Sequence, residues 1–147
     1  MSDLEARLQR LEDLLEIQQL FIDYGSHLDA GRFDEYAKLF ASDGEVKLGP
    51  MGRAKGPEAI QALMESILGN RADSEKSYHL ITSPMVQIDG DSATSEVMWS
   101  VVHIGEDGNP ELSSLGVHND ELVREDGRWK FRERRGSMRI PAVFRQS

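Results

Sequence analysis

Cysteine is absent from this chain of 147 residues, which excludes disulfide bonds, thiolate nucleophiles, iron–sulfur clusters and cysteine-ligated zinc. Positive charge is also scarce, because 17 Lys and Arg residues stand against 26 Asp and Glu residues, giving a net charge of -9. Nucleic acids and anionic membrane surfaces bind to basic faces, so we expect neither as a partner. The basic residues gather in segment 128–139, which still leaves room for one small anionic group.

Long apolar runs are missing too. No stretch approaches the roughly 20 apolar residues of a transmembrane helix, and residues 1–10 are mostly polar, without the apolar region of a secretory signal. We therefore expect a cytoplasmic protein. The length and the 39% hydrophobic share fit one globular domain, 1–147, large enough to bury a core.

Several catalytic motifs are absent as well: the nucleophile elbow, the Walker loop, the dinucleotide-binding glycine motif and the zincin helix. His103 and His118 are expected to approach each other across a hairpin, which gives a weak metal-site hypothesis; surface or wall positions are favoured for both. No bound metal and no organic cofactor are expected.

The first half of the chain reads as helical. Apolar residues at spacings of three and four predict a helix over 3–30, ended by Gly31. Its first three turns look like an exposed extension suited to a dimer contact or to solvent. Shorter helices are predicted at Phe33–Phe40 and, with Pro57 in its first turn, at Pro57–Leu68. A short strand is expected at Glu45–Leu48.

The second half reads as extended, with Gly-containing turns between four predicted strands, which lie at Lys76–Ile88, Ser92–Ile104, Glu111–Arg124 and Arg128–Ile140. Consecutive strands joined by hairpins form an antiparallel meander. Helices first and strands later predict an α+β fold, in which a long curved sheet wraps over three N-terminal helices and encloses a cavity. Pro84 marks its strand as an edge strand or a site of a bulge.

Three residues are candidates for chemistry. His79 is either a half-buried histidine bonded to backbone or a general base, a role that suits an imidazole titrating near neutral pH. Asp29 lies at the negative end of its helix, which is locally unfavourable; it either caps the following turn or serves a function. Tyr24 is either a core residue or a hydroxyl that polarises a substrate carbonyl.

The remaining aromatic and basic residues have two interpretations each. Trp99 fits a core or a cavity wall. Arg132, Arg134 and Arg135 fit a solvated strand edge, or one of them reaches the cavity mouth and holds an oxyanion or carboxylate.

Several segments together resemble the SnoaL-like branch of the nuclear-transport-factor-2-like superfamily, whose members form a cone-shaped half-barrel. These segments are Ile17–Gly31, Phe33–Gly44, Gly56–Ile60, Tyr78–Leu80, Val86–Ala93 and Asp126–Arg135. Within that superfamily the chain looks closest to the group of scytalone dehydratase, bile-acid dehydratase and hexachlorocyclohexane dehydrochlorinase.

That resemblance implies a set of roles. The Asp of the family's catalytic pair matches Asp29, its proton-abstracting His matches His79, and the tyrosine of its dehydratases matches Tyr24. A pocket arginine maps onto Arg134 or, one residue off in register, Arg135. We also expect Trp99 and Phe40 to contact substrate.

The resulting hypothesis is a cofactor-free lyase, dehydratase-like or dehydrohalogenase-like, acting on a small hydrophobic molecule. One alternative is a binding or assembly module, as in the small subunits of ring dioxygenases, and another is an isomerase or cyclase using the same base. Relatives pair through the curved sheet, so a homodimer or homotrimer is expected.

Overall fold

The computed structural model describes residues 2–71 and 76–141. The predicted first helix is confirmed as α1, Asp3–Ala30. The Ser2 side chain accepts the Glu5 N–H at 3.1 Å and so caps the helix start. Gly31 ends the helix in the left-handed conformation, with φ of 72°, which a residue without a Cβ adopts at little cost.

The second helix is shorter than predicted. Helix α2 covers only Phe33–Ala37, because Phe40 already pairs with Phe131 of the last strand and begins strand β1. The helix α3 lies at Pro57–Leu68 as predicted. Three further elements occupy the region between α2 and α3: β1 at Phe40–Lys47, the 3-10 turn η1 at Gly49–Met51, and β2 at Arg53–Lys55.

Four long strands follow, each within one residue of its predicted bounds. They are β3 at Ser77–Asp89, β4 at Ser92–Ile104, β5 at Pro110–Glu125 and β6 at Arg128–Ile140.

The sheet order is β2-β1-β6-β5-β4-β3. Strands β3 to β6 form the predicted antiparallel meander, and β1 adds to it by pairing with β6 in parallel, so the whole sheet is mixed. Strand β3 lies at the sheet edge and its register shifts between Thr82 and Met85, around Pro84. Both expectations for that proline are confirmed.

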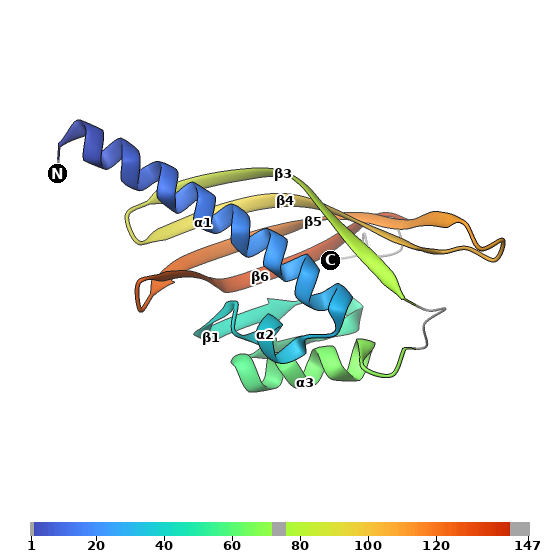
Figure 1. Ribbon diagram of the computed structural model, residues 1–147. Coiled ribbons are helices and arrows are strands. Elements are labelled where there is room, and N and C mark those ends of the chain that lie inside the picture. The colour runs from blue at the N-terminus through green and yellow to red at the C-terminus, as the bar shows by residue number, and fades with distance from the viewer. Residues whose placement is uncertain (1, 72–75, 142–147) are drawn as a thin grey trace.

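The three helices lie against one side of the curved sheet, with α1 running along the long strands and α2 and α3 beside β1 (Figure 1). The α+β class is therefore confirmed. Apolar residues from the helices and the sheet form one core between the two layers. None of the helices in the described part of the chain is long and apolar enough to span a membrane.

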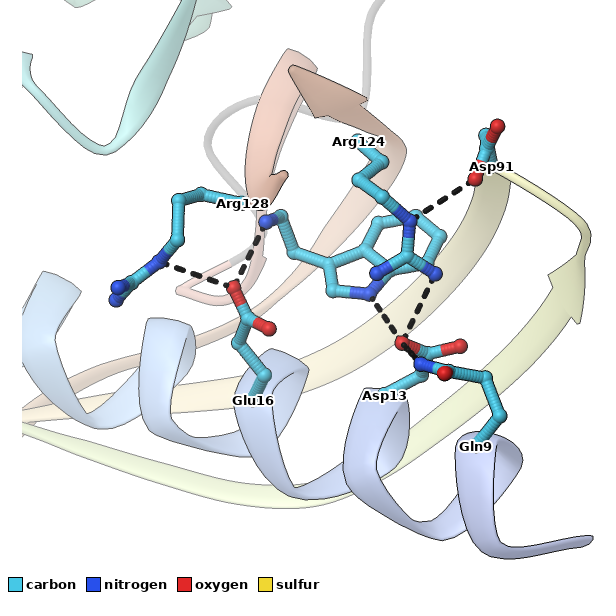
Figure 2. A network of polar contacts seen from close by, with 7 residues as sticks. Gln9, Asp13, Glu16, Asp91, Arg124 and Arg128 are labelled. Carbon is cyan, nitrogen blue, oxygen red and sulfur yellow. Dashed lines mark hydrogen bonds and ion pairs between the residues drawn. The ribbon is translucent and has the colours of Figure 1, made fainter. Parts of the chain in front are cut away.

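A buried carboxylate fixes the first half of α1 to the sheet (Figure 2). Asp13 is only 4% exposed, and its Oδ1 accepts from the Trp129 indole N–H at 3.0 Å, the Arg124 guanidinium at 2.9 Å and the Gln9 amide at 3.1 Å. The Arg124 guanidinium also lies 4.7 Å above the Trp129 ring. Burial raises the pKa of Asp13, but these donors outweigh it and hold the pKa below its ordinary value.

Removing this carboxylate tests how far the anchor stabilises the fold. We expect Asp13→Ala to lower the free energy of unfolding by about 1–3 kcal/mol, because a buried indole N–H loses its acceptor. Urea denaturation followed by circular dichroism measures this loss. Asp23→Ala, on the same helix and in an exposed pair with Gln19, is the control and should stay within about 0.5 kcal/mol of the wild type. Equal losses in both variants would contradict the anchoring role.

Candidate active site

A cavity of about 830 Å³ lies between the helices and the inner face of the sheet, within the usual size range of small-molecule sites. Residues from α1, α3, η1 and all five strands other than β2 line it. Its apolar lining consists of Leu28, Leu48, Pro50, Met51, Met64, Ile67, Leu68, Val101 and Met138. This composition suits a mostly apolar ligand of modest size.

His79 lines this cavity from β3. Its Nδ1 lies 2.7 Å from Asp29 Oδ1, and its backbone N–H donates to both Asp29 oxygens at 3.1 Å. The two side chains are 18% and 17% exposed, so the pair is largely shielded from solvent, with His79 on the cavity side. The structure therefore brings these two predicted residues together across 50 positions of sequence.

Gly25 lies where α1 packs against β3. A Cβ built on Gly25, one helical turn before Asp29, would meet Ile81 at 3.4 Å and the Cβ of His79 at 3.7 Å. Both are ordinary contact distances, so the side chains of β3 lie close to the backbone of α1 at this turn. The close packing places the Asp29 carboxylate within reach of the His79 ring.

The position of the carboxylate has a chemical consequence. Ionised Asp29 only accepts hydrogen bonds, so a neutral His79 must carry its proton on Nδ1. That leaves the lone pair of Nε2 for a molecule in the cavity. This is the arrangement of a carboxylate-oriented general base.

Tyr24 also lines the cavity, and its side chain is 3% exposed. Burial raises the pKa of the Tyr24 hydroxyl above its ordinary value, so the hydroxyl stays protonated at neutral pH. The Arg134 guanidinium lies 4.2 Å from the Tyr24 ring centroid, and the Tyr36 ring lies 4.9 Å away. The Tyr24 ring therefore packs against both the Arg134 guanidinium and the Tyr36 ring.

His118, for which the sequence favoured a surface or wall position, lines the cavity. It is 4% exposed, and its ring lies 5.3 Å from that of Tyr24 and 5.8 Å from that of Trp99. Burial lowers the pKa of His118 well below its ordinary value, with further contributions from Arg134 and His79. The imidazole is therefore neutral at neutral pH.

One edge of the His118 ring approaches a glycine of the cavity wall. Its Cδ2 and Nε2 lie 3.4 Å and 3.6 Å from where a Cβ of Gly136 would stand, while its Nδ1 is buried with no partner in the described structure. Ser114 and His118 lie an even number of residues apart on β5 and both line the cavity. Strand alternation predicts from the sequence that they share a face, but it does not tell which face borders the cavity.

Trp99 lines the cavity as expected. A Cβ on Gly116, its neighbour across the β4–β5 pair, would overlap the indole ring. Glycine at this position therefore lets the ring lie against the backbone of β5.

Two predicted substrate contacts lie outside the cavity lining. Arg134 is fully buried, and Asp120 accepts from its Nε at 2.8 Å and from its Nη2 at 3.1 Å; Ser95 donates to the same carboxylate at 2.8 Å. Phe40 is 1% exposed and packs on Tyr36 and Phe131 in the core. Both residues lie behind the cavity wall: Asp120 binds Arg134 through Nε and Nη2, and Phe40 packs in the core.

Arg135 lines the cavity instead, one residue along the same strand. With Lys47 it contacts Glu133, at 3.2 Å and 3.1 Å, and Arg71 is the third basic residue of the lining. None of the described lining residues is an Asp or Glu; Asp29 and Glu133 instead contact lining residues, Asp29 at His79 and Glu133 at Lys47 and Arg135.

The weak metal-site hypothesis finds no support in the described ranges, where no group of three potential ligands is close enough to hold an ion. His103 pairs with Glu111, whereas His118 pairs with Val97. The two histidines therefore lie well apart along β4 and β5.

Known proteins share this architecture. A solved NTF2-like protein from Novosphingobium aromaticivorans has a TM-score of 0.84 at 25% identity, over 96% of this chain and 91% of that one. A candidate scytalone dehydratase from the same species has a TM-score of 0.76 at 25% identity, over 89% and 87% of the two chains. A hexachlorocyclohexane dehydrochlorinase has a TM-score of 0.78 at 24% identity, over 91% and 90%.

The sequence comparisons agree with the fold. An uncharacterized protein of Mycobacterium tuberculosis is 29% identical over 123 residues, covering 82% of both chains. The family model of the SnoaL-like domain matches residues 9–135. The chain has an NTF2-like fold, which dehydratases and dehydrochlorinases share. Because the family model covers most of the chain, this protein belongs to the SnoaL-like domain family.

Proposed function

We propose that this protein is a lyase that removes water or a halide from a small, mostly apolar molecule without a cofactor. The observation that carries the proposal is the 2.7 Å contact between Asp29 Oδ1 and His79 Nδ1 at the wall of an 830 Å³ cavity. A free imidazole nitrogen facing an apolar cavity is what general-base catalysis needs.

The reaction starts at a carbon next to a carbonyl group. His79 Nε2 accepts the proton from that carbon, and the electron pair of the C–H bond forms the new double bond, directly or through an enolate. The leaving group departs with its own bonding pair, as halide or, after it is protonated, as water. Asp29 stabilises the imidazolium that forms, through the hydrogen bond at Nδ1.

A neutral donor is needed where negative charge develops on oxygen. Tyr24 and His118 both line the cavity and both keep their neutral forms at neutral pH. A buried N–H without a partner is rarer than a buried acceptor without one, which favours the His118 tautomer with its proton on Nε2. That N–H and the Tyr24 hydroxyl are the groups we assign to the substrate carbonyl and to the leaving oxygen.

The named structural relatives support the same reaction class. One is a candidate scytalone dehydratase and another is a hexachlorocyclohexane dehydrochlorinase, so this fold accommodates elimination of either water or chloride. Neighbouring neutral donors in the present cavity favour an oxygenated substrate over a halogenated hydrocarbon, since a hydrocarbon would leave those donors unpaired.

Substitution of the base tests the proposal. Hydroxy-carbonyl and halo-carbonyl compounds are incubated with the protein, and mass spectrometry detects loss of water or hydrogen halide. We expect His79→Ala to lower turnover of an active compound by about 10²–10⁴-fold, and Asp29→Asn to lower it as well, while chelators leave it unchanged. His27→Ala, a histidine of α1 bonded to Arg32, is the control. Products of unchanged mass would assign an isomerase, and full activity of His79→Ala would exclude this base.

The buried neutral state of His118 predicts a pH effect on stability. The pKa of His118 is lowered in the folded protein. Below a pH of about 6.5, the ordinary pKa of histidine, the unfolded chain therefore binds one proton more than the folded protein does. The free energy of unfolding falls as the pH decreases from there. The extra slope approaches about 1.4 kcal/mol per pH unit. Urea unfolding from pH 7 down to pH 5 should show this slope in the wild type and lose it in His118→Gln. Equal slopes in both proteins would mean that folded His118 takes up a proton between pH 7 and pH 5 as readily as the unfolded chain does.

A further inference from the structure

We infer that α1 carries a second, unoccupied apolar face that pairs with α1 of a second copy of this chain, in parallel and around a two-fold axis. This face, here called the leucine seam, consists of Leu4, Leu8, Leu11, Leu15 and Ile22. Each of its residues is between 54% and 72% exposed. Large apolar side chains exposed in one row mark an interaction surface.

The spacing of the seam is that of a coiled coil. Successive members are four, three, four and seven residues apart, so they fill the a and d positions of a heptad repeat, with Leu8, Leu15 and Ile22 at a. The repeat continues through Gln18, a polar residue at the d position. A strict repeat of this kind describes a helix packed along another helix, because a sheet or a loop imposes no such period.

The opposite side of the same helix is already occupied. Asp13, Ile17, Leu20 and Tyr24 are buried against the sheet, and at 100° per residue they lie across the helix from the leucine seam. The first turns of α1 also extend past the end of the sheet (Figure 1). A partner helix can therefore lie along the seam while the two domains point away from each other.

Charged residues beside the leucine seam favour a parallel pair of α1 helices from two copies of this chain. Arg7 occupies a g position and Glu12 the e position of the next heptad, and in a parallel pair these two face each other across the interface. The two-fold axis makes the contact twice, Arg7 to the partner's Glu12 and the reverse. In an antiparallel pair e faces e and g faces g, so Arg7 would have no acidic partner there and Glu12 no basic one.

The absence of cysteine makes a direct test possible. Single Cys substitutions at Leu8 and Leu11, in the full chain, place like residues opposite each other in a parallel pair, within range of a disulfide. Under mild oxidation we expect at least one of the two to give a covalent dimer within minutes. Ala6→Cys, on the same helix but facing away from the seam, is the matched control and should stay uncrosslinked.

Light scattering after size exclusion completes the test. We expect the wild type to run at twice the chain mass, and Leu8→Glu/Leu15→Glu to run as a folded monomer with unchanged circular dichroism, because both leucines are exposed in the single chain. A monomeric or trimeric wild type, a dimer that survives the double substitution, or a dimer that crosslinks at neither position would each overturn the proposal. None of these outcomes depends on the lyase activity.

Discussion

The contact between the end of α1 and strand β3 is the constraint on which the site depends. A carboxylate in the last turn of a helix faces the negative end of the helix dipole, at a cost of about 0.3–1 kcal/mol. Here Asp29 accepts the backbone N–H of His79 with both oxygens and the ring Nδ1 with one of them, which offsets that cost. The same contacts position the imidazole, so helix packing and ring orientation are coupled.

The other buried charges of this acidic chain follow one pattern, in which a carboxylate receives several donors. Asp13 receives three side chains where α1 begins to contact the sheet, and Asp120 receives Arg134 and Ser95 behind the cavity. The ion pair in each cluster adds little to the free energy of unfolding on its own, because desolvation opposes the Coulomb attraction. Each does fix the direction of neighbouring rings, Trp129 in the first case and Tyr24 in the second.

Local sequence signals predicted much of this fold. Spacings of three and four, the glycine turns and the first-turn Pro57 placed α1, α3 and the four long strands nearly to the residue. The parallel pairing of β1 with β6 and the early end of α2 were missed, because both depend on Phe40 meeting Phe131 across 91 positions of sequence. No local pattern encodes that contact.

The site was predictable only in part, for a related reason. The family resemblance selected Asp29, His79 and Tyr24; the structure places His79 and Tyr24 in the cavity lining and Asp29 in contact with the His79 ring. Alternation along β6 did not decide between Arg134 and Arg135, since both faces of the strand carry basic residues. The sequence indicated a surface or wall position for His118 but no role in the site, because its neutrality follows from burial, and burial depends on which face of a long curved strand the helices cover.

The state of one ring nitrogen tests the account most directly. In protein carrying ¹⁵N-labelled histidine at mildly alkaline pH, long-range ¹H–¹⁵N NMR distinguishes the two neutral tautomers of His79. We predict a proton on Nδ1 and a free lone pair on Nε2, with that preference lost in Asp29→Asn. A proton on Nε2 in the wild type, or a tautomer that Asp29→Asn leaves unchanged, would contradict the assignment of His79 as a base oriented by Asp29.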